Sequence, residues 1–195
     1  MSNPSDSNDS TRMSNPSDSN DSAPMSNASH ASPSNGGIAV CPGSYDPVTL
    51  GHLDIISRAA HVFDNLVVGV VNHHIRKKTV FTAEERTAFI EAEVAELGNV
   101  QVKAFDTLLV DFARENGART IVKGLRAISD FEYEFEMNQL NRKMAPDIES
   151  MYLMSAPEFS FLSSSGVKEV ATFGGDLTGL VPPHVAERLK EALRR

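Results

Sequence analysis

The stretch that decides the fold runs from Ile38 to His52 and reads Ile-Ala-Val-Cys-Pro-Gly-Ser-Tyr-Asp-Pro-Val-Thr-Leu-Gly-His. Its first four residues are apolar, which predicts a short strand that is buried on both faces of a sheet. Pro42-Gly43 and Asp46-Pro47 then favour a tight loop. From about His52 onward, apolar residues recur at helical spacing, so a helix should follow. This order of elements predicts an open α/β sheet with a ligand site at the junction.

The signature Thr49-Leu50-Gly51-His52 lies at the start of that helix. A glycine lets the backbone come close to a phosphate, and a helix N-terminus favours an anion. His52 could place an imidazole N–H beside that phosphate. Because so short a motif also arises by chance, the alternative is that His52 is only a helix-start residue. The Walker pattern G-x-x-x-x-G-K-[ST] and the Rossmann pattern G-x-G-x-x-G do not occur in the sequence.

The composition limits the class of protein. The chain has 195 residues and is 41% hydrophobic, which is enough for one domain with a core. Its formal net charge of −8 argues against nucleic acid as a partner. The sequence has no apolar run long enough to span a bilayer and no apolar signal region, so we expect a cytoplasmic protein without a membrane partner. The single cysteine, Cys41, excludes an intrachain disulfide and is expected in the core.

Residues 1–37 differ from the rest of the chain in composition. They are almost all Ser, Asn, Pro, Asp, Ala and Gly, and one decapeptide occurs at Met1 and again at Met13. Such a segment cannot bury enough apolar surface to fold, so we expect a disordered tail at 1–37 and one folded domain at 38–195. A regulated interaction tail and an internal start codon remain alternatives for this segment.

From Ile38 onward, apolar runs and amphipathic segments alternate. After the first strand, further strands are expected at 66–71, 100–104, 120–122 and 150–154. Helices are expected at about 52–63, 82–97, 107–116, 130–144, 164–173 and 182–193. The capping box of Thr82 and Glu85 marks one of these helix starts. Such alternation predicts a doubly wound, Rossmann-like sheet of five parallel strands with helices on both faces.

Polar and cationic residues follow several of the expected strands. They are Ser44 and His52, Arg76 to Lys78, Lys123 and Arg126, and Ser163 to Ser165. Because the carboxyl ends of parallel strands share one edge of a sheet, these groups can converge. An acidic chain that gathers cations and helix N-termini there favours a polyanionic ligand. The alternative is a chance cluster on a solvated surface.

Five motifs in one register resemble bacterial phosphopantetheine adenylyltransferase, and together they cover the chain from about Ile38 to its C-terminus. They are Pro-Gly-Ser-Tyr-Asp-Pro-Val-Thr-Leu-Gly-His, Lys77-Lys78, Phe-Thr-Ala-Glu-Glu-Arg, Lys-Gly-Leu-Arg-Ala-Ile-Ser-Asp-Phe-Glu-Tyr-Glu and Phe-Ser-Phe-Leu-Ser-Ser-Ser-Gly-Val-Lys-Glu-Val. The resemblance implies an enzyme that transfers the adenylyl group of ATP to 4′-phosphopantetheine. The products would be dephospho-coenzyme A and pyrophosphate, in the penultimate step of coenzyme A synthesis. The resemblance also implies Mg²⁺ bound with the ATP, and a homohexamer built as a dimer of trimers.

The same resemblance implies a role for each matching residue. His52 would be the catalytic residue that binds ATP and stabilises the transition state. The 4′-phosphopantetheine would contact Ser44, Lys77, Leu109 and Lys123. Lys123 stands where many relatives carry arginine, and lysine cannot make arginine's bidentate fork, which puts the geometry of this contact in doubt. ATP would contact Ser44, Tyr45, His52, Gly124, Leu125, Arg126, Glu134, Phe159, Ser160, Phe161, Leu162, Ser163, Ser164 and Ser165.

The chemistry of this reaction fits the residues. The nucleophile is a phosphate oxygen that is already ionised near neutral pH, so alignment and charge stabilisation can suffice without a general base. No cluster of carboxylates has metal-ligand spacing, so we expect no metal site in the protein itself, and magnesium held mostly by ATP and water. We expect Arg76 and Lys78 to be solvated, and Tyr133 and Met137 to be core residues.

Two other functions stay open at this point. A sister nucleotidyltransferase for nicotinamide mononucleotide or glycerol 3-phosphate shares the first loop and the sheet. It would need a second-substrate loop that differs from Lys-Gly-Leu-Arg followed by Asp-Phe-Glu-Tyr-Glu. The other alternative is a nucleotide-binding sensor that performs no chemistry, although His52 and the two cationic loops speak against it.

Overall fold

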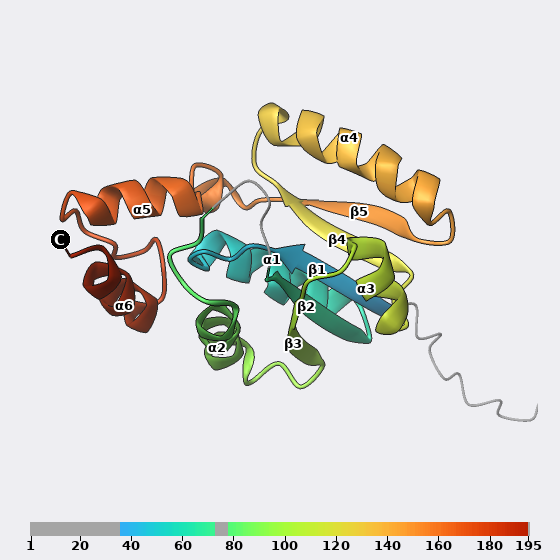
Figure 1. The fold of residues 1–195 in the computed structure, drawn as a ribbon, viewed down its shortest axis with the longest axis horizontal. Coiled ribbons are helices and arrows are strands. Elements are labelled where there is room, and N and C mark those ends of the chain that lie inside the picture. The colour runs from blue at the N-terminus through green and yellow to red at the C-terminus, as the bar shows by residue number, and fades with distance from the viewer. Residues whose placement is uncertain (1–35, 73–77, 195) are drawn as a thin grey trace, which may run out of the picture. The chain divides into compact units, whose positions relative to one another are not determined.

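The structure is a computed structural model that describes residues 36–72 and 78–194. Five strands, all parallel, form one sheet in the order β3-β2-β1-β4-β5 (Figure 1). They are β1 (Ile38–Gly43), β2 (Asn65–Val71), β3 (Val100–Phe105), β4 (Thr120–Leu125) and β5 (Glu149–Met154). The predicted doubly wound, Rossmann-like fold class is confirmed. The predicted tail lies outside the described residues except for its last two positions, and stays a prediction.

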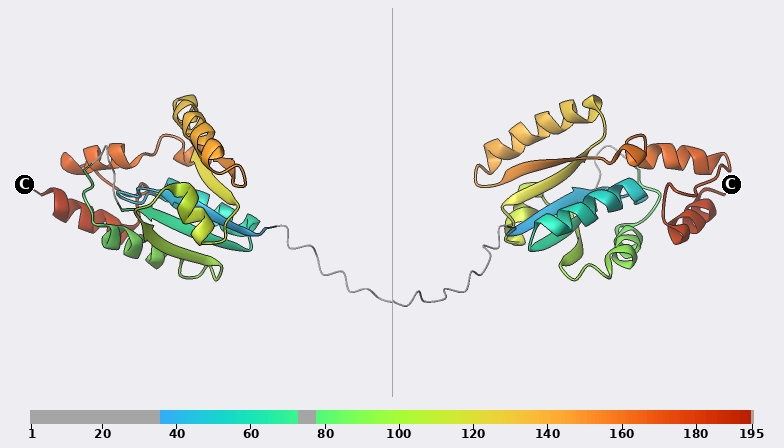
Figure 2. Two further views of the ribbon diagram at one scale, coloured as in Figure 1. Left: turned by 45° about the vertical axis from the view of Figure 1, so that its right-hand side comes forward. Right: turned by 180° about the vertical axis from the view of Figure 1, so that it is seen from behind.

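Six α-helices follow the strands in the described part of the chain. They are α1 (Leu50–Val62), α2 (Ala83–Val94), α3 (Leu109–Glu115), α4 (Ile128–Met144), α5 (Ser164–Thr172) and α6 (Pro183–Leu193), with a short 3₁₀ turn at Pro157–Phe159. Helix α3 lies in front of the sheet in Figure 1 and α1 lies behind it, and the view from behind in Figure 2 brings α1 forward. The sheet is therefore covered on both faces.

Two hydrophobic cores lie on the two faces of the sheet, and side chains alternate between them along β1. Ala39 and Cys41 belong to the core that α1, α2, α5 and α6 cover, whereas Val40 belongs to the core that α3 covers. Such two-residue alternation is expected for a strand that is buried on both faces. Cys41 is 4% exposed, so the prediction that it is a core residue is confirmed.

Strand ends differ from the prediction at the two strands nearest the expected ligand site. Strand β1 continues through Pro42 to Gly43, because Pro42 lies beyond the two residues that pair with β4 and leaves no ladder bond unmade on that side. Strand β4 continues to Leu125, because Lys123, Gly124 and Leu125 pair with β5. These three residues were expected in a loop, and only Arg126 leaves the strand.

Helix α4 differs from the prediction in its surroundings. The expected core residue Tyr133 has 54% of its surface exposed, so that prediction is wrong. The other exposed apolar side chains of the helix are Ile128, Phe131, Phe135, Leu140 and Met144. Helical spacing of apolar residues shows which side chains share a face, but it cannot tell whether the rest of the chain covers that face. No helix among the described residues has the length and apolar character to cross a membrane.

Candidate active site

A cavity of about 400 Å³ opens at the carboxyl ends of β1 and β4. These strands are neighbours from the two halves of the sheet, and in the described chain they pair only at Ala39–Thr120 and Val40–Ile121. Beyond these pairs, residues 41–45 at the end of β1 and Lys123 with Arg126 at the end of β4 line the cavity. The cavity therefore lies at the point where the strand order reverses, which is where open α/β sheets bind ligands.

The structure brings most of the predicted site residues into this cavity. Those that line it are Ser44, Tyr45, His52, Lys123, Gly124, Arg126, Glu134, Leu162, Ser163, Ser164 and Ser165. They come from the ends of β1 and β4, from the starts of α1, α4 and α5, and from the loop before α5. The predicted convergence at one sheet edge is confirmed for Ser44, His52, Lys123, Arg126 and Ser163 to Ser165.

His52 lies in the first turn of α1, and its side chain takes part in the cap of that helix. The backbone N–H of Thr49 donates to His52 Nδ1 at 3.0 Å, while the Thr49 hydroxyl accepts from the His52 backbone N–H at 3.3 Å. Because Nδ1 accepts a hydrogen bond, the ring proton of the neutral imidazole is on Nε2. Burial, together with the positive charge of Arg126, lowers the pKa of His52 to about 4. His52 is therefore a neutral N–H donor at pH 7.

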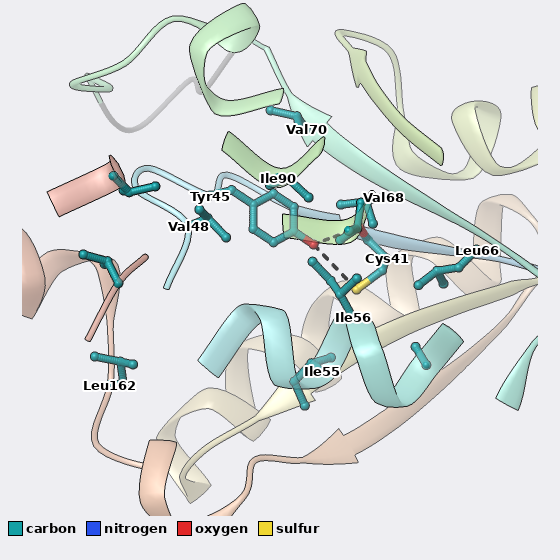
Figure 3. Close-up of a cluster of buried hydrophobic side chains, with 14 of the residues drawn as sticks. Cys41, Tyr45, Val48, Ile55, Ile56, Leu66, Val68, Val70, Ile90 and Leu162 are labelled. Atoms are coloured by element: carbon teal, nitrogen blue, oxygen red, sulfur yellow. Dashed lines mark hydrogen bonds between the residues drawn. The ribbon is translucent and has the colours of Figure 1, made fainter. Parts of the chain in front are cut away.

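Tyr45 lines the cavity, and its side chain is buried in the hydrophobic core with Val48 and Ile90 (Figure 3). The hydroxyl donates to the Cys41 carbonyl oxygen at 2.9 Å, and the ring meets the imidazole of His52 edge-on, with 5.2 Å between the ring centroids. A Cβ on Gly43 would lie 2.8 Å from the Tyr45 ring, so this position needs glycine. The buried Tyr45 ring thus packs against the imidazole of His52.

Two cations at the end of β4 are paired with carboxylates of α4. Lys123 Nζ lies 2.5 Å from Glu134 Oε2, and Arg126 makes a bidentate pair with Asp130, with both distances 3.0 Å. Arg126 also donates to the carbonyl oxygen of Leu162 at 2.8 Å, and its hydrogen bonds lower the pKa of Asp130. Sequence reasoning missed Asp130, although its i,i+4 spacing from Arg126 was a usable signal.

The start of α5 forms a third wall of the cavity. Ser163 caps the helix, since its hydroxyl accepts from the backbone N–H of Gly166 at 3.0 Å. The hydroxyl of Ser164 donates to the carbonyl oxygen of Pro47 at 2.8 Å, which ties α5 to the loop before α1. A helix N-terminus at this position favours an anionic group in the cavity.

Some predicted residues are not part of the cavity wall. Leu109 lies at the start of α3 and packs against the core on the opposite face of the sheet. Leu125 is buried in β4, and Phe159, Ser160 and Phe161 form the 3₁₀ turn and the residues directly after it. Lys77, with Arg76, lies outside the described residues, and Lys78 is exposed as expected. The predicted ligand contacts of the wall residues and of these outlying ones alike stay predictions.

Carboxylates in the cavity do not form a metal cage. In residues 36–72 and 78–194 there is no group of three His, Cys, Asp or Glu side chains that could hold a metal ion. The two carboxylates of α4 that line the cavity, Asp130 and Glu134, each face a cation instead. The cations and the helix N-terminus that line the cavity favour an anionic ligand.

Comparison with known proteins identifies the family. Residues 40–170 match the model of the cytidylyltransferase-like family. Phosphopantetheine adenylyltransferase of Rubrobacter xylanophilus is 54% identical over 158 residues, which cover 81% of this chain and 96% of the relative. The enzyme of the same name from Symbiobacterium thermophilum is 56% identical over 153 residues, with coverages of 78% and 94%.

Solved structures share the fold at lower identity. A crystal structure described as a putative nicotinate-nucleotide adenylyltransferase from Vibrio parahaemolyticus has a TM-score of 0.60 and 20% identity, and it covers 81% of this chain and 94% of its own. Nicotinic acid mononucleotide adenylyltransferase of Plasmodium falciparum has a TM-score of 0.61 and 13% identity, with coverages of 80% and 95%. At these identities the likeness concerns the fold alone. The relatives that are more than half identical show that the chain belongs to the phosphopantetheine adenylyltransferases, a family of nucleotidyltransferases.

Proposed function

We propose that this chain transfers the adenylyl group of ATP to 4′-phosphopantetheine and releases dephospho-coenzyme A and pyrophosphate. The observation that carries the proposal is the neutral Nε2–H donor of His52, which lines one cavity together with the cations of β4 and the N-terminus of α5. A nucleotide sensor would have no need of a fixed donor between two phosphate-binding walls. A cytoplasmic location for the reaction stays a prediction.

The triphosphate of ATP fits the side of the cavity that Arg126 and the start of α5 form. Arg126 supplies a planar cation, and Ser163 to Ser165 supply a helix N-terminus and hydroxyl groups. Because Arg126 already donates to the Leu162 carbonyl, the cation and the residues before α5 are held together. We assign the β- and γ-phosphates to this wall and the α-phosphate to the neighbourhood of His52.

Transfer of the adenylyl group requires no proton to be removed from the nucleophile, since the acceptor phosphate is already ionised near neutral pH. Negative charge on the α-phosphate oxygens is the feature that the protein must stabilise. His52 can donate its Nε2 proton to one of these oxygens without giving the proton up. A pKa near 4 favours this role, because the imidazole keeps one donor and stays neutral while it acts.

The acceptor phosphate fits the side formed by Ser44 and Lys123. Lys123 is paired with Glu134, so an incoming phosphate would share this cation with the carboxylate or displace it. Lys77, predicted to bind the same phosphate, lies outside the described residues and is proposed from the family motif alone. The contact of Leu109 with the pantetheine arm is likewise proposed from the family resemblance alone.

Magnesium is proposed as the ion that arrives with ATP. The site residues fit such an ion only through the phosphates, because Asp130 and Glu134 are engaged by Arg126 and Lys123. Mg²⁺ commonly keeps several waters and binds substrate phosphates in sites of this kind. It would neutralise charge on the triphosphate, whereas His52, Arg126 and the start of α5 would orient it.

A homohexamer is supported by the exposed apolar side chains of α4. Ile128, Phe131 and Phe135 follow one another at spacings of three and four residues, and Tyr133, Leu140 and Met144 form a second stripe. Phe131 and Tyr133 are two residues apart, so the two stripes point in different directions. A helix with two apolar stripes suits contact with more than one neighbouring copy. Analytical ultracentrifugation, which gives the mass of the assembly, tests the hexamer.

The substrate specificity is tested by pyrophosphate release. We expect the full chain with ATP and magnesium to release pyrophosphate with 4′-phosphopantetheine at least about 100-fold faster than with nicotinamide mononucleotide or glycerol 3-phosphate. A preference for either of these acceptors would assign the chain to a sister activity. ATP binding without pyrophosphate release from any acceptor would leave only the sensor.

A further inference from the structure

Arg86 of α2 is a charged side chain in a position that is normally apolar. It is 1% exposed and is the largest of the fully buried side chains. Burial lowers the pKa of its guanidinium below the ordinary value, but an arginine remains charged at neutral pH. A buried charge is costly unless hydrogen bonds satisfy it, so its contacts show what the side chain does.

All four hydrogen bonds that the Arg86 guanidinium makes with described residues go to backbone carbonyl oxygens. Nε donates to Phe81 at 3.2 Å and Thr82 at 3.1 Å, just before α2. Nη1 donates to Ser44 at 2.6 Å and to Val71, the last residue of β2, at 2.9 Å. One guanidinium thus joins the end of β2, the entry to α2 and the loop after β1. Of these partners, Ser44 lines the cavity.

Asp46 anchors the same loop after β1, two residues beyond Ser44. Its carboxylate is also buried, accepts from the backbone N–H groups of Val80 and Phe81 at 3.0 Å, and pairs with Lys168 of α5 at 2.9 Å. Phe81 therefore gives its N–H to Asp46 and its carbonyl oxygen to Arg86. The short loop from Ser44 to Asp46 is fixed at both ends by buried charges that meet at one segment.

The residue between these two anchors adopts an unfavourable backbone conformation. Tyr45 has φ of +48°, a region that non-glycine residues rarely occupy and that persists only where the surroundings impose it. The anchors at Ser44 and Asp46 supply that constraint. Without the bond from Arg86, the Ser44 peptide would be free to relax toward an ordinary conformation and to move relative to His52.

We propose that Arg86 is a positioning residue for adenylyl transfer, which fixes the backbone of Ser44 and thereby the alignment of the two substrates in the cavity. This inference rests on the proposed function. Alignment is a large part of catalysis when no covalent or acid–base step is involved, and a misplacement of about 1 Å can lower the rate about 100-fold. Arg86 does not itself line the cavity, so it acts through its hydrogen bond to Ser44, which does.

The test compares Arg86→Lys and Arg86→Met with wild type and with Val94→Ala. Val94 is a buried core residue of the same helix, two turns further on, and serves as a control for lost stability. Calorimetric titration with ATP counts the intact sites, and steady-state pyrophosphate release then gives kcat per site and both KM values. For Arg86→Lys we expect kcat per site to fall about 10- to 100-fold with KM for ATP changed less than about threefold. Arg86→Met should fall further.

The control should behave in the opposite way. Val94→Ala should lower the melting temperature while kcat per site stays within about twofold of wild type. If Arg86→Lys also loses only melting temperature and keeps wild-type kcat per site, Arg86 is a structural residue and the inference is wrong. The inference is equally withdrawn if neither Arg86 variant folds. If wild type itself gives no pyrophosphate with 4′-phosphopantetheine, the proposed function fails rather than the positioning role.

Discussion

Helices α1 and α4 both border the cavity, but they are held in different ways. Helix α1 buries Ile55, Ile56, Ala59 and Ala60 against the sheet and supplies His52. Helix α4 supplies Asp130 and Glu134, yet Asn141 is its only buried residue among those described, and six of its apolar side chains are exposed. One wall of the cavity is fixed by the chain's own core, and the other is fixed mainly by ion pairs.

This difference separates two contributions to the site. The hydrogen-bond donor belongs to a rigid element, so His52 should have the same geometry in one isolated chain as in an assembly. The cations of β4 are paired with carboxylates of α4, so in the proposed hexamer we expect their geometry to depend on the copies that cover the exposed stripes of that helix. We call the side of the cavity that carries His52 the donor wall, and the side formed by β4 and α4 the α4 wall. The donor wall is tested by replacing His52. The α4 wall is tested by disrupting the proposed contacts of the exposed α4 stripes.

Replacing His52 should give the largest effect. His52→Ala removes the proposed donor to the α-phosphate but leaves Arg126 and the start of α5 in place. We expect kcat to fall roughly 10²–10³-fold, which corresponds to about 3–4 kcal/mol, while the affinity for ATP changes little. Single-turnover formation of dephospho-coenzyme A gives the rate, and calorimetry gives ATP binding.

His61→Ala serves as the matched control, since His61 lies on the same helix, is exposed and does not line the cavity. It should keep the wild-type rate. Normal turnover in His52→Ala would reduce His52 to a helix-start residue. An equal loss of ATP binding and turnover would make it a ligand of the ground state instead.

Disrupting the contacts proposed for the exposed face of α4 should lower kcat less than His52→Ala does, but should change the mass of the assembly strongly. Leu140→Asp places a charge in the stripe that begins at Tyr133 on the rim of the cavity. We expect the assembly to dissociate toward smaller species and kcat to fall about tenfold, because the α4 carboxylates lose fixed positions without any loss of the donor. Ultracentrifugation and pyrophosphate release are measured on the same sample.

Ala92→Asp is the control for this experiment, because it adds the same charge at an exposed position of α2, a helix that carries neither of the two apolar stripes. It should change neither mass nor rate. A Leu140→Asp chain that dissociates but keeps full activity would show that α4 holds its carboxylates unaided, and the comparison of the two walls would lose its meaning.

Much of the donor wall could be predicted from the sequence. The apolar run from Ile38 to Cys41, the loop glycines and the helical pattern after Thr49 are local signals, and local signals determine a strand–loop–helix unit. The capping box of Thr82 and Glu85 was likewise readable and is present, with hydrogen bonds of 3.0 and 3.2 Å. Because the strands were predicted to be parallel, the loops at their carboxyl ends could also be predicted to lie at one edge of the sheet.

The remaining features depend on contacts between distant segments. The strand state of Lys123 to Leu125 comes from pairing with β5, and the burial of Arg86 comes from carbonyl groups 15 and 42 residues away. The exposure of Tyr133 depends on what lies beside α4, which the helical pattern does not contain. Such features leave no periodic trace in the sequence, so they became visible only in the fold.

The smallest expected effect is a change in the pKa of His52. It measures how strongly Arg126, on the α4 wall, affects the protonation of the donor. Burial is the larger cause of the low pKa near 4, and the charge of Arg126 is the smaller one. Arg126→Gln should therefore raise the pKa of His52 only part of the way toward its ordinary value of 6.5. Carbon-13 and nitrogen-15 NMR of the His52 ring in both proteins measures this difference directly.

The sign of the pH dependence follows from the same pKa. Since the folded pKa is depressed, the unfolded chain binds a proton at His52 between about pH 6.5 and pH 4 and the folded chain does not, so folding stability falls as the pH is lowered through this window. Above about pH 7.5, one unit above the ordinary value, the imidazole is mostly neutral in both states, and His52 should add little slope to stability or rate. If the pKa returned fully to 6.5 in Arg126→Gln, the wall of β4 and α4 would control the donor, and the two walls could no longer be treated as separate.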